Sequence, residues 1–417
     1  MWLIGLLLSF SLGFCLSLQD AIDKALENSP EVSAKRHILR SKAQLLSSER
    51  QLYLPEFFLN YRHSIQSEKQ SIQIIGFPAS FESSKRSYQV FQGGIRQTLF
   101  DGGLRSSAIS LSESAVKVAQ EDLGETLLDV KLQTIRAYLD VLSAKALVEV
   151  HQKQLSAVSS ELRLREAFFK EGLVAITDVL QAKVRLAEVQ RDLRQAEGSY
   201  RIALENLSRL TGLPVQELKD LQEPKIDLQE PSLEELIESA LENRPIVRLA
   251  RERLRIAQAQ RKLELSNYYP KLFVEALYTY SDQNPALKPK DFFTLSAGLS
   301  VSFQSLRNYY RALAYLEEEK SYKEELRDIQ QKIRLEVKSA YERYLTAKDN
   351  LKVAQESLSF AEEFYRLSLE QYKNQIISGT DLLQAEASLT QARKNLVLAY
   401  YELLKAYYEL LRAGGKL

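Results

Sequence analysis

The feature that most constrains this chain is an internal duplication. Residues 17–30 return as residues 232–245, at an offset of 215 (232 − 17), and both stretches end in Asn-X-Pro. Residues 177–182 return as residues 380–385, at an offset of 203 (380 − 177). Solenoid repeats have periods of about 20–50 residues, so this is a tandem copy of a whole structural half. We predict a first repeat over 16–211, a linker over 212–231 and a second repeat over 232–417.

The composition permits a helix-rich chain and gives no sign of a nucleic-acid partner. The 417 residues include 56 basic and 55 acidic side chains, so no net charge points to DNA or RNA. Proline breaks helix interiors, and no proline lies between Pro78 and Pro214 or after Pro289. Both stretches can therefore form very long helices.

The N-terminus resembles a targeting segment. An apolar run over 2–12 is too short to span a membrane as a helix, and we predict a signal peptide over 1–15. Lipidation of Cys15 is the rival interpretation, but the bulky Phe14 before it favours simple cleavage. The mature chain then has no cysteine and no disulfide.

Each repeat is predicted to run helix, strand, loop, strand, long helix, turn, long helix. The first helix covers about 17–51, and the Asn-X-Pro step bends or interrupts it. Ser17 with Asp20, and Ser232 with Glu235, fit an N-terminal capping box, in which an acid follows the cap by three residues.

Four segments alternate between apolar and polar residues, as strands with one apolar face do. They cover about 57–66, 91–99, 272–280 and 293–304, and polar loops over 68–85 and 282–290 join them in pairs. A length of about ten residues, with aromatic residues near the ends, is typical of tilted membrane β-strands. An ordinary half-buried sheet is the alternative, and the signal peptide favours the membrane.

A very long helix follows each strand pair. Residues 104–170 would span roughly 100 Å as one helix, and Gly172 ends it. The returning helices keep a seven-residue apolar period, which predicts a left-handed coiled coil. Its positions in the first copy are Val179, Ala182, Leu186, Val189, Leu193, Ala196, Tyr200, Ala203, Leu207 and Leu210. In the second copy they are Leu382, Ala385, Leu389, Ala392, Leu396, Ala399, Leu403, Ala406, Leu410 and Ala413.

Four membrane strands in one chain cannot close a barrel, and open sheet edges are not tolerated in lipid. The chain must therefore assemble. Two copies would give eight strands with a filled interior, and three would give twelve with a wet lumen, which the polar strand faces favour. The long helices are charged throughout and must lie in water. We expect a β-barrel continued by a tube of coiled-coil helices, that is, a conduit.

Three motifs carry a resemblance to a known family over nearly the whole chain. They are 25–30 (Ala-Leu-Glu-Asn-Ser-Pro) with its second copy, 98–105 (Thr-Leu-Phe-Asp-Gly-Gly-Leu-Arg), and 172–179 (Gly-Leu-Val-Ala-Ile-Thr-Asp-Val) with its counterpart at 379–383. In this order they resemble the TolC-type outer-membrane efflux proteins.

The resemblance implies an α+β membrane protein that forms a homotrimer, with a twelve-stranded barrel in the outer-membrane lipid bilayer and an α-helical tunnel in the periplasm. It implies docking on a periplasmic adaptor and an inner-membrane pump or exporter. The function implied is a passive exit duct for small molecules, ions or proteins in tripartite efflux or type I secretion, without a cofactor.

The second copy departs from the family pattern at two places. Its strand-to-helix corner, 303–307, lacks the Asp-Gly-Gly of the first, and Gln375 stands where Gly172 stands in the first copy. We therefore expect the second hairpin to be the moving gate and the first to be a static wall.

By resemblance, the helical turns form the periplasmic mouth of the tunnel. Asp381 would point inward and form a ring of three carboxylates, a pore constriction that favours cations. Gln384 stands where the family often has a second acid, so the constriction would be less acidic. The alternative is that Thr177-Asp178 and Thr380-Asp381 cap the returning helices, which suits Asp178 well. For Asp381 the two roles are open and compatible.

The resemblance also places a gate latch and an adaptor groove near these turns. Tyr372 would hold the hairpins together by a hydrogen bond to Asp178, and Tyr372→Phe would then raise conductance; the alternative is a tyrosine half-buried on its helix. Ile377 replaces a basic residue of some relatives.

The adaptor groove would contain Gly172, Leu173, Thr177, Gly379 and Thr380, although Gly172 also fits a plain helix break. The strand-to-helix corner of Phe100, Asp101, Gly102 and Gly103 would be structural.

No catalytic constellation is present in the sequence, so we expect no enzyme. His37, His63 and His151 are scattered over two predicted helices and a strand, which does not favour a metal site. The main rival is a secreted coiled-coil adhesin or scaffold, which explains the heptads but not paired strands at equivalent positions. A periplasmic adaptor would have one hairpin and no membrane strands.

Overall fold

The computed structural model describes residues 16–224, 232–301 and 306–417. The predicted signal peptide and residues 302–305 of the second strand-to-helix corner lie outside the described residues. The first repeat contains α1 (Leu18–Asn28), α2 (Pro30–Arg50), η1 (Gln51–Tyr53), β1 (Glu56–Ile65), β2 (Gln70–Gln73), β3 (Ser80–Ser84), β4 (Ser87–Phe100), α3 (Leu104–Lys170) and α4 (Ile176–Thr211). After η2 (Val215–Leu218), the second contains α5 (Leu233–Asn243), α6 (Pro245–Ser266), β5 (Lys271–Ser281), β6 (Asp291–Ser300), α7 (Arg307–Lys373) and α8 (Gly379–Ala413).

The chain divides into two compact units, and each contains parts of both repeats. The first unit comprises Met1–Arg36, Asp122–Val247 and Asp328–Leu417, and the second comprises His37–Glu121 and Arg248–Arg327. The described residues of the first unit are mainly helical. The second unit contains the strands with the helix segments next to them.

The first helix of each repeat is divided at the predicted Asn-X-Pro step. Ser29, between α1 and α2, has an extended backbone with φ −66° and ψ 117°. Both bonds of the predicted capping box between Ser17 and Asp20 are present. In the second repeat Ser232 accepts from the Glu235 amide as predicted, but its hydroxyl donates to Glu234.

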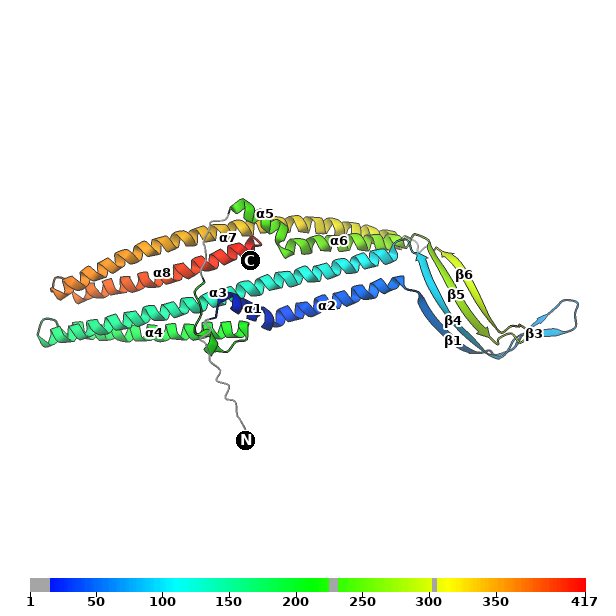
Figure 1. Ribbon diagram of the computed structural model, residues 1–417, viewed down its shortest axis with the longest axis horizontal. Coiled ribbons are helices and arrows are strands. Elements are labelled where there is room, and N and C mark those ends of the chain that lie inside the picture. Colours follow the sequence, from blue (N-terminus) through cyan, green and yellow to red (C-terminus); the bar gives the residue numbers. More distant parts are fainter. Residues whose placement is uncertain (1–15, 225–231, 302–305) are drawn as a thin grey trace, which may run out of the picture. The chain divides into compact units, whose positions relative to one another are not determined.

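The four predicted strands form one antiparallel sheet in the order β1-β4-β5-β6, as Figure 1 shows. Side-chain rows cross all four strands: Phe57 lies opposite Ile95, and further along this row Ala276 lies opposite Leu295. β1 and β6 are the outer strands. Within the described residues each of them pairs along one side only, so each leaves one edge open. β6 covers Asp291–Ser300, and residues 302–304 of the predicted strand lie outside the described residues.

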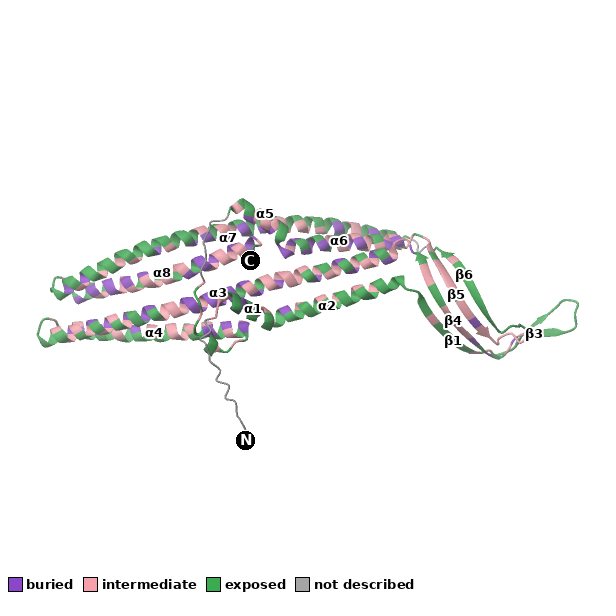
Figure 2. Ribbon diagram, in the orientation of Figure 1, coloured by how far each residue is buried: buried purple, intermediate pink, exposed green. Residues whose placement is uncertain are grey.

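One face of this sheet is apolar and open. The side chain of Phe57 on β1 is 74% exposed and that of Phe293 on β6 is 82% exposed. Figure 2 shows both outer strands as largely exposed. The opposite face carries polar side chains, including Asn60, Gln92, Arg96, Glu275 and Ser296. An apolar face of this extent needs lipid or protein to cover it.

The predicted loop over 68–85 is wrong in part, because it contains a two-stranded sheet. β2 pairs antiparallel with β3, and Ile72 lies opposite Phe81. The alternation of Ile72 and Ile74 with polar residues is short and lies among serines and glutamines, so its pattern does not distinguish a strand from a loop. The second loop, over 282–290, contains no strand, as predicted.

A single carboxylate fixes the first strand-to-helix corner. Gly102 and Gly103 have φ of +67° and +88°, in the left-handed region that favours glycine. Asp101 accepts hydrogen bonds from the amide groups of Gly103 and Arg105, and from Nε of Arg105 at 2.6 Å. Phe100, the last residue of β4, leads into this turn.

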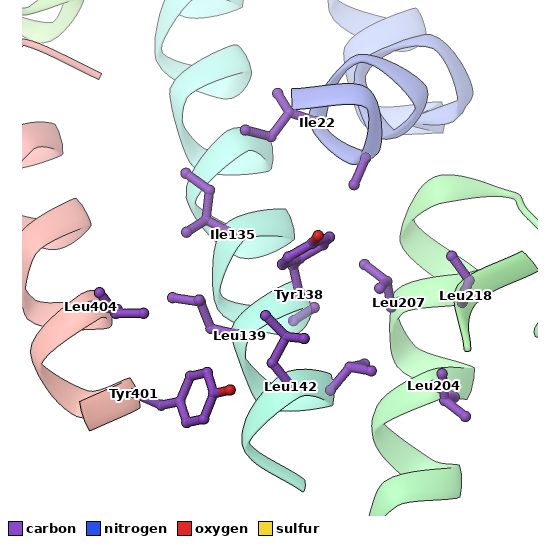
Figure 3. Packing of buried hydrophobic residues seen from close by; sticks show 13 residues of the cluster. Ile22, Ile135, Tyr138, Leu139, Leu142, Leu204, Leu207, Leu218, Tyr401 and Leu404 are labelled. Atoms are coloured by element: carbon purple, nitrogen blue, oxygen red, sulfur yellow. The ribbon is translucent and has the colours of Figure 1, made fainter. Parts of the chain in front are cut away.

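The core of the first unit surrounds Tyr138 of α3 (Figure 3). The side chains packed there come from α1, α4, η2 and α8, and include Ile22, Leu204, Leu207, Leu218, Tyr401 and Leu404. The Tyr138 hydroxyl lies 2.8 Å from the Leu16 carbonyl oxygen and 2.6 Å from that of Gln222. The tyrosine thus joins α3 to the start of the first repeat and to the linker that follows this repeat.

The predicted heptad seams of the returning helices are confirmed. Every seam position on α4 and α8 is buried or half-buried. Within residues 16–224, 232–301 and 306–417, no helix carries an apolar stretch long enough to cross a membrane.

Candidate functional site at the helical hairpin turns

The two hairpin turns share one backbone geometry. Gly172 has φ +73° and Gln375, at the equivalent position, has φ +61°. In each turn the next amide bonds back to the helix, from Leu173 to the Phe168 carbonyl at 2.9 Å and from Ile376 to the Gln371 carbonyl at 2.8 Å. Gln375 therefore pays a steric cost that Gly172 avoids, because a left-handed backbone crowds Cβ.

The two returning helices begin with different caps, which corrects part of the capping prediction. The N-cap of α8 is Ser378, which forms a full capping box with Asp381. The N-cap of α4 is Ala175, whose side chain has no hydroxyl to offer, so the Asp178 carboxylate makes no such box. The Thr177 and Thr380 side chains lie one residue before these acids and are exposed.

The predicted constriction residues lie on the first turns of α8. Asp381 and Gln384 are both exposed. Hydrogen bonds from the Ser378 hydroxyl and amide hold the pKa of the Asp381 carboxyl below its ordinary value. Asp381 is therefore ionised at neutral pH, and the capping role it has in this chain leaves its charge in place.

The expected hydrogen bond from Tyr372 to Asp178 is not formed. Tyr372 is only 4% exposed, and its hydroxyl has no hydrogen-bond partner among the described residues. Its ring packs against that of Phe168, with centroids 6.1 Å apart, and lies 5.4 Å from the guanidinium carbon of Arg165. Burial raises the pKa of the Tyr372 hydroxyl.

Arg165 takes the place expected of that latch. It lies on α3, is fully buried, and forms an ion pair with none of the described carboxylates. Its Nη2 donates to the Gly379 carbonyl at 2.9 Å, and its Nη1 donates to the Asp178 carbonyl at 3.4 Å. One side chain of the first hairpin therefore binds the beginnings of both returning helices, α4 and α8.

Glu161 is a second buried charge, one helical turn before Arg165. The Tyr365 hydroxyl of α7 donates to its Oε1 at 2.9 Å, while its Oε2 has no partner among the described residues. Burial raises the pKa of the Glu161 carboxyl, and the nearby Glu386 acts in the same direction. Arg165 and Arg185 oppose this shift.

Glu386 of α8 completes the polar cluster. Arg185 of α4 binds its Oε2 through Nε at 3.1 Å and Nη2 at 2.9 Å. Gln154 of α3 and Thr390 of α8 both donate to its Oε1 at 2.9 Å. All four long helices therefore contribute to one buried network beside the turns.

The sequence holds a signal for this network in the spacing of polar residues along α3. The buried residues His151, Gln154, Val158, Glu161 and Arg165 of α3 step by three and four, as the seam of a coiled coil does. Polar residues at such positions commonly fix register at some expense of stability. The polar seam positions of α3 thus point to three members of the network, Gln154, Glu161 and Arg165, and to His151, which contacts Gln154.

The predicted adaptor-groove residues differ in solvent exposure. Gly172, Leu173, Thr177 and Thr380 are exposed. Gly379 is buried, and a methyl group added to it would lie 2.9 Å from Nη1 of Arg165. Gly379 is therefore covered by Arg165 of the same chain and is not available to contact a partner protein.

The histidines do not come together. His37 lies on α2, His63 on β1 and His151 on α3, where His151 contacts Gln154 and burial lowers its pKa. The part of the chain that the structure describes contains no group of three or more histidine, cysteine or acidic side chains suited to a metal ion.

Two long helical hairpins, joined to paired strands with an open apolar face, define the class of outer-membrane export channels. The model of the outer membrane efflux protein family matches residues 21–213 and 236–416, so the chain belongs to that family. The predicted family is thus confirmed, as is the predicted combination of long helical hairpins with a small sheet. The family consists of transport channels and not of enzymes.

Relatives agree with this assignment. Outer membrane protein TolC of Vibrio cholerae is 26% identical over 274 residues, which are 64% of this chain and 59% of that protein. Cobalt-zinc-cadmium resistance protein CzcC of Cupriavidus metallidurans is 27% identical over 173 residues, 42% of this chain and 41% of that protein. The matched part is less than two thirds of each relative.

Among solved structures, the outer membrane protein VceC of Vibrio cholerae is similar to this chain with a TM-score of 0.79 and 17% identity. The match covers 95% of this chain and 96% of that chain. This likeness shows the fold.

The left-handed Gln375 predicts opposite effects for two substitutions. Gln375→Gly should raise the free energy of unfolding by about 0.5–1 kcal/mol, because relief of the backbone cost exceeds glycine's extra freedom in the unfolded chain. Gly172→Gln, the matched control, should lower it. Chemical unfolding of the purified protein in detergent measures both, and a loss of stability in Gln375→Gly would contradict this account.

The raised pKa of Glu161 predicts how stability depends on pH. The folded chain retains this proton above pH 4.5, the ordinary value, where the unfolded chain loses it. The contribution of Glu161 to stability therefore falls as pH rises through its raised pKa. Glu161→Gln still accepts from Tyr365 but cannot ionise, so it should raise Tm at pH 7 and flatten this fall.

The control for Glu161→Gln is Glu356→Gln, at an exposed position on α7. It should leave the pH profile of Tm unchanged. Equal profiles for the wild type and Glu161→Gln would show that Glu161 carries no such linkage.

Proposed function

We propose that this chain is the outer-membrane exit duct of a tripartite efflux or type I secretion system. The observation that carries the proposal is the four-stranded sheet with an exposed apolar face and two outer strands, β1 and β6. Lipid would cover the apolar face, and further copies of the chain would pair the open edges. Membership of the efflux family supports this assignment.

The proposed assembly is a homotrimer. Three copies give twelve strands, and a barrel of that size encloses water, which suits the polar face of the sheet. Two copies would give eight strands around a filled interior. The charged helical parts of the chain would lie in the periplasm and continue the barrel as a tunnel.

We place the gate of the duct at the hairpin turns, with Asp381 and Gln384 lining its constriction. Arg165, Glu161 and Arg185 would hold the second hairpin, α7–α8, against the first. Movement of that hairpin would return these buried charges to water, which offsets part of the cost of breaking their bonds. The closed arrangement is therefore stable but opens for a modest free energy.

The proposed partners are a periplasmic adaptor and an inner-membrane pump or exporter. Leu173 is 50% exposed at the first turn, next to the exposed Gly172 and Thr177, and Thr380 is exposed at the second. These residues would contact the adaptor. A passive duct takes its cargo from the pump, and the name of the relative CzcC refers to metal resistance while that of TolC names no cargo.

A secreted coiled-coil adhesin is the alternative, and the open apolar face of the sheet counts against it. The two differ in where the chain fractionates. The duct should be recovered with outer membranes, need detergent for extraction and form conducting pores in planar bilayers. Recovery of the chain in a soluble periplasmic fraction would contradict the proposal that it forms a duct.

The carboxylate ring predicts an effect on ion selectivity. Asp381→Asn removes three charges from the constriction of the trimer, so the ratio of K⁺ to Cl⁻ permeability should fall. Asp178→Asn is the matched control at the first turn and should change this ratio little. Reversal potentials in a KCl gradient measure both, and an equal effect of the two variants would remove Asp381 from the constriction.

The hydrogen bonds predict which tyrosine restrains the gate. Tyr365→Phe removes the bond to Glu161 between α7 and α3, so it should raise single-channel conductance or the open fraction. Tyr372→Phe removes a hydroxyl that has no hydrogen-bond partner in the described part of the chain. It should leave both quantities unchanged, in contrast to the expectation from family resemblance. The reverse pattern in planar bilayers would restore Tyr372 as the latch.

A further inference from the structure

The β2–β3 ribbon has one apolar face that the rest of the described chain leaves open. Ile72 lies opposite Phe81, and the Phe77 ring stacks on that of Phe81 with centroids 6.4 Å apart. Each of these side chains, and that of Ile74, is more than half exposed. The other face is polar, where Gln73 lies opposite Ser80.

The base of this ribbon is fixed by contacts with the loop over 282–290. Nζ of Lys85 lies 3.0 Å from Oδ2 of Asp282, and the Lys85 amide donates to the Gln283 carbonyl at 2.8 Å. The Gln89 amide donates to Oδ1 of Asp282 at 2.7 Å. The ribbon therefore stands in a set position at the ends of the strands and is not a loose tether.

The loop over 282–290 exposes an apolar residue of its own. Leu287 is 62% exposed, between Pro285 and Pro289. Within a single copy of the chain, the ribbon base contacts this loop. The described residues of that copy nevertheless leave the apolar face of the ribbon and Leu287 exposed. Both surfaces need a cover from outside the chain.

The order of the strands indicates which partner covers the apolar face of the ribbon and Leu287. The ribbon follows β1 directly, and the loop precedes β6 directly, so each surface adjoins an open sheet edge. Successive strands are antiparallel, so β1 of one copy pairs antiparallel with β6 of the next when the sheet closes. The end of β1 at Ile65 then lies beside the start of β6 at Asp291. The ribbon of one copy comes beside the loop of its neighbour.

We propose that the apolar face of the β2–β3 ribbon packs on the 282–290 loop of a neighbouring copy of this chain, with Phe77 against Leu287. The inference rests on the proposed assembly and adds a contact outside the barrel wall. Lipid headgroups are a poorer occupant, because Glu68, Lys69, Glu82 and Lys85 give residues 68–85 a net charge of 0 (+2 − 2), so the segment has no excess of positive charge to attract anionic headgroups.

Thiol crosslinking in isolated outer membranes tests this contact. Phe77→Cys with Leu287→Cys should give covalent multimers with a short bis-maleimide, roughly tenfold more than the matched pair Gln73→Cys with Leu287→Cys, whose first thiol lies on the polar face. The wild-type chain, whose only cysteine is Cys15, gives the background. Trimers that resist dissociation in mild detergent show separately that assembly has occurred.

Each outcome decides the inference. If trimers form but the two pairs crosslink equally, the ribbon contact is wrong and the duct proposal stands. If Phe77→Cys alone crosslinks, the ribbons meet one another and the loop is not their partner. If no trimer forms, the proposed assembly fails together with the contact. As a second readout, Phe77→Ser should lower the temperature at which trimers dissociate, and Gln73→Ser should not.

Discussion

The open edges of one β-sheet are the constraint on which the rest of this structure depends. β1 and β6 each leave a row of backbone N–H and C=O groups unpaired in the described chain, and such groups are costly to bury in lipid. The exposed apolar face of the same sheet is costly to leave in water. The proposed assembly of several copies within a membrane would satisfy both demands. A single copy of the chain thus has the features that such an assembly requires.

A second constraint lies in the seam between the helical hairpins. Apolar side chains would pack there with greater stability, yet α3 places Glu161 and Arg165 at seam positions. Both keep an atom without a partner among the described residues, Oε2 of Glu161 and Nε of Arg165. Such partly satisfied charges lower stability and reduce the free energy needed to separate the hairpins. We interpret this seam as a compromise between holding and releasing the gate.

Much of the fold could be predicted because it depends on local patterns. Absence of proline, the break at Gly172 and the heptads defined 104–170 as one helix, and α3 has those bounds. Period-two alternation located the four strands. The missed β2–β3 ribbon has too few residues for its period to stand out. The positions of the long helices and of the four strands could thus be predicted from the sequence. The alternation of apolar and polar residues was insufficient to predict the short strands β2 and β3.

The site was harder to predict because its contacts depend on three-dimensional partners. Tyr372 was expected to bind Asp178, but Arg165 occupies the space between the hairpins and binds the backbone carbonyl of Asp178. Asp178 was expected to cap α4, but the cap position holds Ala175 where the second copy holds Ser378. In the first case a residue outside the compared motif decided which bond formed, and in the second case it was Ala175, a position at which the two copies differ. The differences between the copies therefore mattered more than their likeness.

The central claim is that the sheet of this chain closes only with other copies. Native mass spectrometry of the assembly, extracted from outer membranes in mild detergent, tests this most directly. The account predicts particles of three chains, which supply twelve strands. A monodisperse single chain in detergent, or a particle of two chains, would contradict it.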